Sequence, residues 1–553
     1  MISKEWYVAD FETTDYKYYE EKGFTKVWLY AVCDKDANIT KIGNSIDDFM
    51  KYIRTLYGKT IYFHNLKFDG QFILDFLLKN GYKYYDDLKD VNKGFTTLIG
   101  EMGEFYSLTI KFGSHHQVHI YDSLKLLPFK VKKIAKDFGL PIEKEVIDYS
   151  NYEITPQAIH YVCNDVKIIA MALSKIKEQG MNKMTTASCA YKQYTSMKSE
   201  DFLYGAFPDL SSEWLTEWRN AYRGGRSQVN PIYQGEIIKN VKRYDINSMY
   251  PHIMRNMQLP YGEPIKCNEP GKFNFELYKI SVEFSLKEMH LPSLLKKSGL
   301  YANEDSYYIE SDGIEILWIS SIDFELLKRN YNITYLEFIE IYGFRTSSLM
   351  FFDYVDKWYA KKQTDKGAPK IVDKLMLNSL YGKFGSDHKG YVKIPVIDEV
   401  TWIVKFIKSE ERDKKHYYLP IAIAITSYAH LLLDNAIHET GLMNFVYCDT
   451  DSIHTLGELP KSWIDNVALG KFKLEGIEQK AKYVRQKCYV HKDQEEITIT
   501  CAGMTDDMKE HAIEMYGENI FKVFKEGFIM NGKLLPKRVK GGIVLYETTF
   551  EIK

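Results

Sequence analysis

The sequence predicts a multidomain chain of mixed α/β and α+β architecture. Its 553 residues exceed what one hydrophobic core usually supports, so several domains are expected. Its hydrophobic content of 45% is ample for burying those cores. Short β-branched or aromatic runs repeatedly end in acidic residues, and one of them leads into a helix-like apolar run.

The composition limits the classes of function that the chain can have. Aromatic residues make up 15% of it, which suits packing and also offers flat faces for bases and sugars. A formal net charge of -2 argues against coating nucleic acid with the whole surface but allows local basic channels. The seven cysteines are scattered, without a C-x-x-C pair, so we expect a reduced intracellular chain. With no secretory leader and no apolar run of about 18 residues, we expect no membrane partner.

The first predicted strand places two acids together. Residues 6–9 are apolar and end at Asp10, with Glu12 two residues later. Alternate residues of a strand point to the same face, so these two carboxylates should converge. For Asp10 alone, the alternative is a helix cap or a surface charge.

Two further acids follow predicted elements of the same region. The strand at residues 60–63 leads toward Asp69, which precedes a predicted helix at residues 72–78. A helix should begin at Pro156, because proline suits the first helical position. Tyr161 and Asp165 lie four residues apart on it and should share a face.

A second acidic group is expected near residue 450. Residues 445–447 suit a strand, and strand character resumes at Ile453 after a turn that contains Asp449 and Asp451. Paired carboxylates can hold two Mg²⁺ about 4 Å apart. The alternative is a solvated acidic turn. Asp245, at the end of another predicted strand, supplies a third carboxylate.

Basic residues recur every four positions in the next candidate site. Lys370, Lys374 and Asn378 follow this spacing and Tyr381 comes three residues later, which places them on one helix face. A glycine and a proline interrupt the pattern before residue 370, so Lys362 should lie on a preceding helix. Like charges at this spacing repel unless a triphosphate neutralises them. The alternative is a solvated basic face.

These residues resemble two known families. Asp10, Glu12, Asp69 and Asp165 with Tyr161 resemble the DEDDy 3′-to-5′ exonucleases of ribonuclease H-like fold, over about the first 185 residues. The motifs at 245–251, 374–382, 447–452 and 487–489 occur in the order found in family B DNA polymerases. Tyr-x-Gly-Gly at 222–225 and the C-terminal run resemble more specifically the protein-primed, strand-displacing polymerases of small double-stranded-DNA bacteriophages.

The resemblance implies roles for exonuclease residues. Asp10, Glu12, Asp69 and Asp165 would hold two Mg²⁺, for which Mn²⁺ could substitute, while Tyr161 would orient the attacking water. Lys144 would support the scissile phosphate. The frayed single strand would be gripped by Thr13, His64, Asn65, Phe68, Ser123 and Leu124.

The resemblance also implies roles for polymerase residues. Two Mg²⁺ would be held by Asp245, Asp451 and the carbonyl of Ile246, with Asp449 a ligand in only part of the cycle. The nucleotide would contact Tyr250, Lys362, Lys370, Lys374, Asn378 and Tyr381. DNA would contact Tyr222, Gly224, Gly225, Ser248, Gly382, Lys487 and Tyr489. Related enzymes commonly have an arginine where this chain has His430, and a mostly neutral imidazole would not replace that charge.

The implied organisation is a ribonuclease H-like exonuclease domain at 1–188 and a right-hand polymerase domain at 189–553. The palm would span about 189–260 and 420–506, the fingers about 353–385 and the thumb about 507–553. An insertion at about 275–350 would contact a priming protein. Another at about 386–419 would close a tunnel around the template and help to peel off the displaced strand.

The resulting functional hypothesis is a DNA-directed DNA polymerase with a proofreading exonuclease that replicates a linear phage genome. We expect its partners to be a DNA primer-template, deoxynucleoside triphosphates and a terminal protein that primes synthesis. The chain should act as a monomer in the cytoplasm of an infected bacterial host. The alternatives are a metal-dependent repair nuclease whose second half grips DNA, and a non-catalytic replication scaffold.

Overall fold

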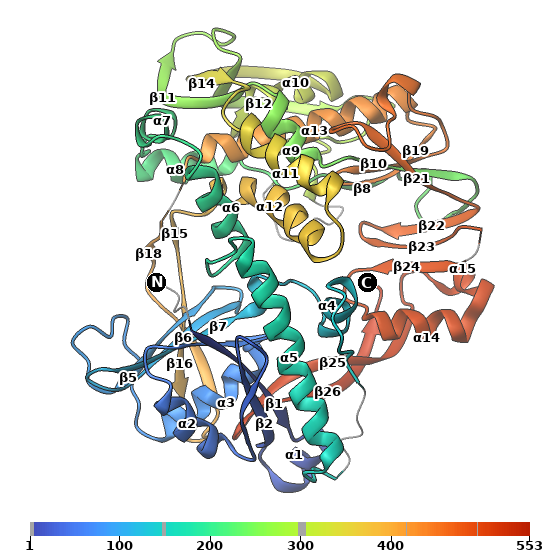
Figure 1. Cartoon of the computed structure of the whole chain (residues 1–553). Coiled ribbons are helices and arrows are strands. Elements are labelled where there is room, and N and C mark those ends of the chain that lie inside the picture. Colours follow the sequence, from blue (N-terminus) through green and yellow to red (C-terminus); the bar gives the residue numbers. More distant parts are fainter. Residues whose placement is uncertain (1–4, 146–150, 297–305, 416, 495) are drawn as a thin grey trace.

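The computed structural model describes residues 5–145, 151–296, 306–415, 417–494 and 496–553. Both predicted insertions contain residues outside this part of the chain, at 297–305 and at 416. The N-terminal elements form the lower part of the molecule in Figure 1, and the elements from α6 to β24, apart from the strands β15 to β18, form the larger upper part. The long helix α5, Pro156–Glu178, runs from the lower part toward the upper one.

The lower part is built on a seven-stranded mixed sheet. Its strand order is β3-β2-β1-β4-β7-β6-β5, with parallel pairing of β4 to both β1 and β7. The strands are β1 Trp6–Thr13, β2 Val27–Asp34, β3 Ile39–Gly43, β4 Thr60–Phe63, β5 Gly94–Ile99, β6 Phe105–Gly113 and β7 His116–Asp122. A mixed sheet with flanking helices agrees with the expected ribonuclease H-like architecture.

Helices cover both faces of this sheet because its strands alternate apolar side chains between them. Val8 and Leu29 belong to the core that includes α5, whereas Ala9 and Phe11 belong to the core under α2 and α3. These two helices are Ile46–Thr55 and Leu66–Lys79. Asp10 and Glu12 lie at even positions, like Val8, so they share the face that α5 covers.

The predicted start of α5 is confirmed, but the predicted start of α3 is wrong. Pro156 begins α5, and the Thr155 side chain accepts a hydrogen bond from the Ala158 amide. Helix α3 begins at Leu66 rather than near residue 72, which puts Asp69 in its first turn. The carboxylate of Asp122, at the end of β7, accepts the Asn65 amide 3.0 Å away and so stabilises this earlier start.

The centre of the upper part is a five-stranded sheet with the order β21-β10-β20-β19-β8. Its strands are β8 Ser227–Val229, β10 Val241–Ile246, β19 Phe445–Asp449, β20 Ser452–Thr455 and β21 Phe472–Glu478. Strands β19 and β20 pair in antiparallel fashion around the acidic turn, as the sequence predicted. Helices α9 Met249–Asn256 and α13 Leu419–Thr440 contact each other beside this sheet.

Helix α13 corrects one expectation. By length and composition it is apolar enough to cross a membrane, although we expected no run of that kind. The sequence conceals it because scattered polar residues, including His430 and Asp434, interrupt the apolar run. Within the structure, 78% of its most apolar window is buried, against neighbours that include α9, α10 and α12.

The lysine-rich segment forms two helices, as expected. Helix α11, Phe352–Thr364, carries Lys362, and helix α12, Ala368–Phe384, carries Lys370 and Lys374. Gly367 separates them with a φ of 60°, a conformation that glycine adopts at little cost. Helix α6, Thr186–Thr195, packs against α12 and therefore belongs to the upper part.

The remaining elements form the outer parts of the molecule. A four-stranded sheet, β11-β14-β12-β13, consists of Leu259–Cys267, Tyr331–Ser347, Phe275–Leu286 and Glu315–Ser320, and α10, Ser321–Asn330, packs on it. Another, β24-β23-β22-β9, consists of Ile497–Cys501, Cys488–Lys492, Lys480–Arg485 and Ile237–Ile238. The other helices are α1 Tyr16–Lys22, α4 Val131–Asp137, α7 Glu200–Ala206, α8 Ser212–Trp218, α14 Asp506–Tyr516 and α15 Ile520–Val523.

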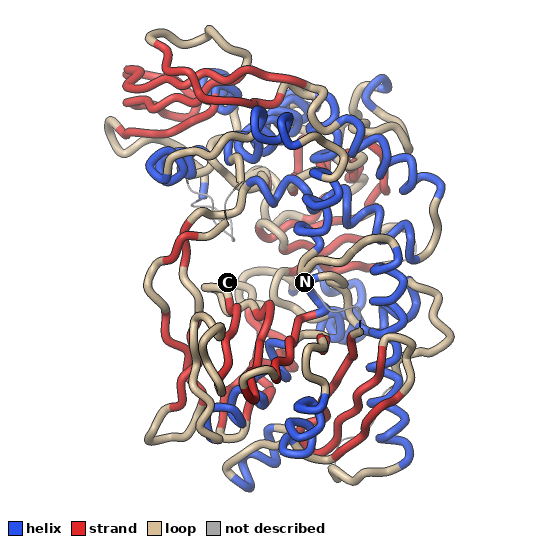
Figure 2. Tube along the Cα trace, turned by 60° about the vertical axis from the view of Figure 1, so that its left-hand side comes forward, coloured by secondary structure: helices blue, strands red, loops and turns tan. Residues whose placement is uncertain are grey.

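Two extensions join the upper part to the lower one. The first is a strand arm formed by β15 Lys389–Gly390, β16 Lys393–Ile397, β17 Val404–Lys408 and β18 Arg412–Asp413, which descends along one side (Figure 2). On this arm, Lys408 and Arg412 pair with acids of the lower part at 2.9 and 2.8 Å. The second is the C-terminal hairpin of β25 Ile529–Val539 and β26 Gly542–Glu551, which contacts α3.

Candidate active sites

The first carboxylate cluster lies where β1 meets α5. Single ligand oxygens from Asp10, Glu12 and Asp165 lie within 4.8 Å of one another. Asp69, in the first turn of α3, is close enough for the charges of Asp10 and Glu12 to raise its pKa. The structure thus brings together the four acids that the sequence predicted, from three separate elements.

The electrostatics of this cluster favour a bound cation. Burial, followed by the charge of Asp165, raises the pKa of Asp10 to about 7. Burial and the charge of Asp10 raise the pKa of Asp69 well above its usual value. Among the described atoms, Asp165 Oδ1 is buried without a hydrogen-bond partner. Carboxylate oxygens that lie close together are ligands that a divalent metal prefers, so these residues fit a metal site.

Lys144 and Tyr161 border the cluster. Lys144 Nζ forms an ion pair with Asp165 Oδ2 and lies 5.0 Å from the centre of the Tyr161 ring. Burial alone would lower the pKa of Lys144, but the Asp165 carboxylate outweighs it and raises that pKa. A cavity of about 150 Å³ opens beside Asp10, Lys144 and Asp165. The site therefore has room for a small group next to its acids.

Two of the residues predicted to grip a single strand form hydrogen bonds within the protein. The ring nitrogens of His64 contact Ser123 Oγ at 3.0 Å and the Phe129 carbonyl at 2.8 Å. Burial also lowers the pKa of His64 to about 4, so its ring is neutral. Ser123 is fully buried and donates to the Phe63 carbonyl. These contacts fix His64 and Ser123 at the junction between β4 and β7, and their contact with a single strand stays a prediction.

The other residues of that set remain accessible. Asn65 is exposed, and Thr13, Phe68 and Leu124 are half-buried. The Phe68 ring packs against Phe72 on one side, with ring centres 5.9 Å apart. Their predicted contacts with a strand remain predictions.

The second acidic site is at the end of the central sheet. Asp245 on β10 pairs in register with Ser452 on β20, and the Ile246 amide donates to the Asp451 carbonyl at 2.8 Å. Burial and the nearby Asp451 raise the pKa of Asp245 to about 7. The two carboxylates therefore face each other across neighbouring strands, which fits the predicted metal pair.

Asp449 is arranged differently. Both of its carboxylate oxygens lie 2.8 Å from Lys487 Nζ, and the Tyr447 hydroxyl donates to one of them at 3.3 Å. Of the residues that the structure describes, Asp245, Asp449 and Asp451 do not form a three-ligand group like that of Asp10. Lys487 was predicted to contact the primer backbone, whereas here its ammonium group neutralises Asp449.

Three lysines converge on the same site. Lys362 on α11 donates to Ser248 Oγ at 2.8 Å. Burial, followed by the charges of Lys374 and Lys370, lowers the pKa of Lys362. The opposite charge of Asp245 offsets only part of this lowering. Lys370, Lys374 and Asn378 are exposed along one face of α12, as predicted. This concentration of positive charge beside two carboxylates suits an anionic substrate that arrives with a metal.

Two tyrosines form a flat surface next to the lysines. The rings of Tyr250 on α9 and Tyr381 on α12 stack with centres 4.1 Å apart and planes inclined by 27°. Burial, followed by the charge of Tyr381, raises the pKa of Tyr250 well above its usual value. Tyr222 adds to this shift, which places it near the same pair. Gly382, one residue further on α12, has open space around it.

The Tyr-x-Gly-Gly loop supports the acidic turn directly. A Cβ at Gly225 would lie only 2.9 Å from Thr450 Oγ1, so glycine is required for this close approach. The Thr450 amide donates to the Arg226 carbonyl at 2.7 Å, and Thr450 itself has a φ of 59°. Tyr489 lies beneath the turn, with its ring 5.3 Å from that of Tyr447.

Sequence reasoning missed two charged residues at the second site. Lys473 on β21 pairs in register with Asp245, and the charge of Glu475 raises the pKa of Asp245. The alternating charges in the segment from Phe472 to Glu478 were a weak signal of a strand with one polar face. Nothing in that segment indicated which acid it would pair with.

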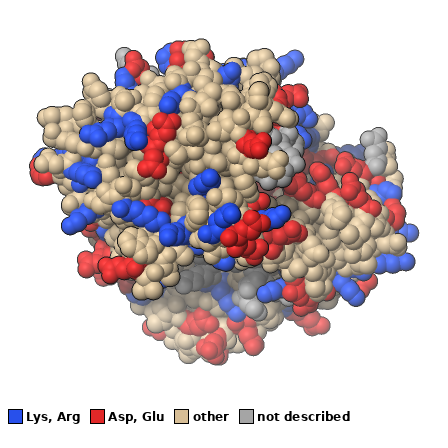
Figure 3. All heavy atoms as spheres, turned by 90° about the horizontal axis from the view of Figure 1, so that it is seen from below, with Lys and Arg blue, Asp and Glu red and all other residues tan. Residues whose placement is uncertain are grey.

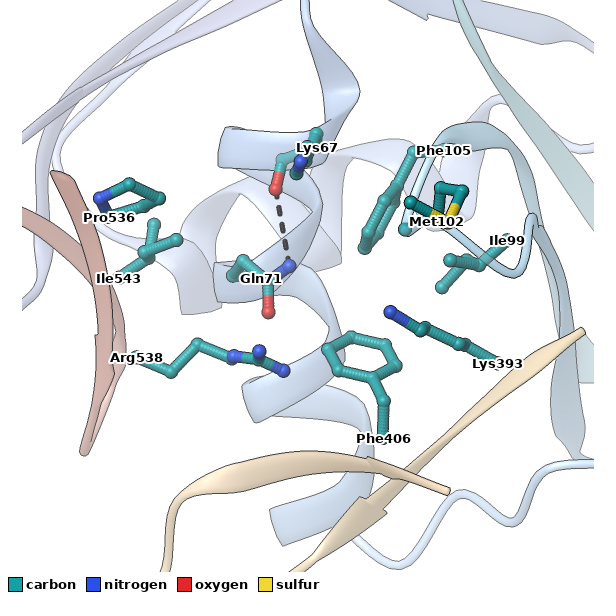
Figure 4. A pocket seen from close by; sticks show the side chains of 11 residues that line it. Lys67, Gln71, Ile99, Met102, Phe105, Lys393, Phe406, Pro536, Arg538 and Ile543 are labelled. Atoms are coloured by element: carbon teal, nitrogen blue, oxygen red, sulfur yellow. Dashed lines mark hydrogen bonds between the residues drawn. The ribbon is translucent and has the colours of Figure 1, made fainter. Parts of the chain in front are cut away.

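A basic cavity lies where the strand arm, the C-terminal hairpin and α3 meet. It has a volume of about 190 Å³, and the cations that line it are Lys67, Lys393 and Arg538. Figure 4 shows Lys393, Arg538 and the Gln71 carbonyl oxygen pointing into it. Gln71 Oε1 is buried without a partner in the described structure. Seen from below, the surface carries groups of both basic and acidic side chains (Figure 3), which agrees with the small net charge.

The paired carboxylates on a central sheet, the lysine-bearing helices and the separate acidic cluster define a nucleotidyl-transfer enzyme with an appended nuclease-like domain. The chain belongs to the family of DNA polymerase type B, organellar and viral, which matches residues 51–153 and 147–468. The predicted polymerase class is thereby confirmed.

Individual relatives agree along the whole chain. The DNA polymerases of Bacillus phages PZA and phi29 are each 37% identical to this chain over 593 aligned residues. Each alignment covers 100% of this chain and 100% of the relative. The DNA polymerase of Streptococcus phage Cp-1 is 32% identical, over 99% of this chain and 98% of its own. The structure of phi29 DNA polymerase complexed with primer-template DNA has a TM-score of 0.90, 35% identity and complete coverage of both chains. The fold of exonuclease, palm, fingers and thumb is confirmed by this match.

The raised pKa values predict how pH affects stability and metal binding. An acid whose pKa is raised to about 7 in the folded state lowers stability as pH rises from about 4 to 7. A divalent metal needs deprotonated carboxylates, so excess MgCl₂ should raise the melting temperature more at about pH 8 than at about pH 6. Differential scanning fluorimetry with EDTA as the reference measures this shift.

Matched variants identify the source of that shift. Asp10→Asn with Asp165→Asn should reduce it, whereas Asp75→Asn should not, because Asp75 is a buried acid of α3 that pairs with Lys79. An equal shift at both pH values, or one that the double variant leaves intact, would contradict the metal assignment.

Proposed function

We propose that this DNA polymerase extends a primer at the Asp245 and Asp451 site and removes nucleotides from a 3′ end at the Asp10 cluster. The observation that supports it most is the convergence of Asp245 and Asp451 beside the lysines of α11 and α12. The structures of phi29 DNA polymerase include one with primer-template DNA and incoming nucleotides, at 36% identity and a TM-score of 0.90. By this similarity the substrates are a DNA primer-template and deoxynucleoside triphosphates.

The polymerase site would bind and orient the reacting groups. Asp245, Asp451 and the Ile246 carbonyl would hold Mg²⁺, which would stabilise the attacking and leaving oxygens of the phosphoryl transfer. Lys362, Lys370 and Lys374 would neutralise the triphosphate. Burial and the charges of Lys374 and Lys370 lower the pKa of Lys362, and binding of that anion would relieve the repulsion among the three lysines.

Other residues would select the nucleotide and align the primer. The stacked Tyr250 and Tyr381 would support the sugar and leave no space for a ribose 2′-hydroxyl. Ser248, Asn378 and Gly382 would help to position the base pair and template. When DNA binds, the Lys487 ammonium group would leave the Asp449 carboxylate and contact a phosphate of the primer backbone, which carries the same negative charge. Asp449 would then be free to ligate metal in that part of the cycle.

The exonuclease site would use the acids at β1, α3 and α5. Asp10, Glu12, Asp69 and Asp165 would hold Mg²⁺, which would supply a deprotonated water. Tyr161 would orient that water, and Lys144 would leave Asp165 to contact the scissile phosphate. Asn65, Thr13, Phe68 and Leu124 would hold the single strand, with His64 and Ser123 supporting them from within.

The strand arm would handle the template and the displaced strand. Its contacts with the lower part and the cationic cavity of Figure 4 support a path for a phosphate backbone between arm, hairpin and α3. Synthesis would begin from a hydroxyl of a terminal protein bound at the insertion of residues 275–350. The enzyme would act as a monomer in the cytoplasm of an infected bacterium.

Single substitutions should separate the two activities. Asp245→Ala should abolish nucleotide incorporation, because it removes a metal ligand, and leave exonuclease activity on single-stranded DNA. Asp165→Ala should abolish exonuclease activity on single-stranded DNA and leave nucleotide incorporation. Extension and degradation of a labelled primer measure both. Incorporation by Asp245→Ala at the unaltered rate would refute the polymerase site and favour a repair nuclease.

Shortening the arm tests strand displacement. Replacing residues 393–408 with a short glycine linker should stop extension through a duplex but spare the filling of a single-stranded gap. Lys405→Ala is a matched control, since Lys405 pairs only with Asp398 of the same hairpin among the ion pairs of the described residues. Undiminished displacement by the shortened enzyme would exclude this role.

Protein priming can be tested with labelled nucleotide. Incubation with a candidate terminal protein, Mg²⁺ and radiolabelled deoxynucleotide should attach the label covalently to that protein. The Asp245→Ala enzyme serves as the negative control. If only DNA primers are extended, across the terminal proteins of the related phages, the priming proposal is wrong.

A further inference from the structure

His430 lies at the contact between helix α13 and two other parts of the polymerase domain. Its side chain is 2% exposed, so it cannot touch a primer strand. Nδ1 is 3.0 Å from Asp323 Oδ1, on α10 of the first insertion. Nε2 is 2.7 Å from the carbonyl oxygen of Gly224, in the Tyr-x-Gly-Gly loop. The ring therefore bridges the insertion and the loop.

With Asp323 ionised, both bonds can form together only if the ring carries two protons. A carbonyl oxygen and an ionised carboxylate accept hydrogen bonds, and a neutral imidazole has a single N–H. The other oxygen of Asp323 accepts from the hydroxyls of Ser320 at 3.1 Å and Ser427 at 2.6 Å, and the buried guanidinium of Arg223 lies 4.0 Å from it. A buried guanidinium calls for an anion nearby, so these neighbours hold Asp323 as a carboxylate. The partners of His430 thus call for an imidazolium ion.

The loop that His430 holds is in direct contact with the catalytic turn. Gly225 leaves no room for a Cβ beside Thr450, and the Arg226 carbonyl accepts the Thr450 amide at 2.7 Å. Thr450 stands between Asp449 and Asp451. A shift of the loop would consequently move the turn that carries both acids.

Buried arginines strengthen the same connection. Arg223 donates to the carbonyls of Leu295 and Trp318 in the insertion, at 2.9 and 3.1 Å. Arg226 pairs with Asp434, one helical turn after His430 on α13, at 2.8 Å. The loop therefore has a charged anchor on each side, and a neutral ring at position 430 would lose one of its two bonds.

We infer that His430 is a positioning residue whose imidazolium cross-links the insertion at Asp323 to the Gly224 carbonyl and so holds the Asp449 to Asp451 turn in its active geometry. This inference rests on the proposed assignment of those acids to nucleotidyl transfer. His430 thereby supplies a buried cation within the protein and leaves the primer strand to other residues.

Ring protonation can be measured without any activity assay. In protein labelled with ¹⁵N-histidine, the His430 ring should show two protonated nitrogens at about neutral pH. Its signals are assigned by their loss in His430→Arg. A single protonated nitrogen would overturn the inference, whether or not the polymerase assignment is correct.

Kinetics then test what the cross-link does. His430→Gln has no charge and should lower kcat for nucleotide incorporation about tenfold, with KM for the nucleotide changed less than about twofold, because the lysines of the fingers are untouched. Asp323→Asn should have a similar effect. His430→Arg restores a cation with several donors and should retain most of the activity.

Exonuclease activity and melting temperature report whether each variant folds. If His430→Gln fails to fold, the kcat of Asp323→Asn and the ring signals of the unaltered protein test the inference in its place. An unchanged kcat in folded His430→Gln, or equal losses in the Gln and Arg variants, would overturn the inference. Absence of nucleotide incorporation by the unaltered protein would instead refute the proposed polymerase function.

Discussion

The structure depends on the cost of placing carboxylates close together in partly buried positions. Burial and the charge of Asp165 raise the pKa of Asp10, and burial and the charge of Asp451 raise the pKa of Asp245. A fold can hold such pairs only if rigid elements fix them, since free side chains would move apart. The first site takes its acids from a strand and two helices, and the second from the ends of neighbouring strands and the turn between them, so rigid elements fix the acids at both.

Lysines occupy comparable positions at both sites. Lys144 pairs with Asp165, and Lys487 pairs with Asp449, so each ammonium group offsets one acid of its cluster. The pairs thus lower the electrostatic cost of placing several acids together. The proposed functions of both sites would have each lysine exchange its acid for a substrate phosphate.

Much of the local structure was predictable because it depends on nearest neighbours. The strand before Asp10, the helix starting at Pro156, the break at Gly367 and the turn at Asp449 follow from alternation, capping and backbone preference. The start of α3 was missed because the Asp122 carboxylate, 57 residues away, accepts the Asn65 amide. The internal hydrogen bonds of His64 and Ser123 were missed for a related reason, since their partners lie on other elements.

By itself, the sequence determined which acids, lysines and tyrosines occur together in each motif, the order of the motifs and hence the polymerase class. Only the tertiary structure decided which of these side chains contact one another in space. Lys473 joins Asp245 through strand pairing, Lys487 turns to Asp449, and His430 reaches Asp323 across 107 residues. Periodicity describes neighbours along one element, whereas the charge state of a buried side chain depends on partners that only the folded chain brings within hydrogen-bonding distance.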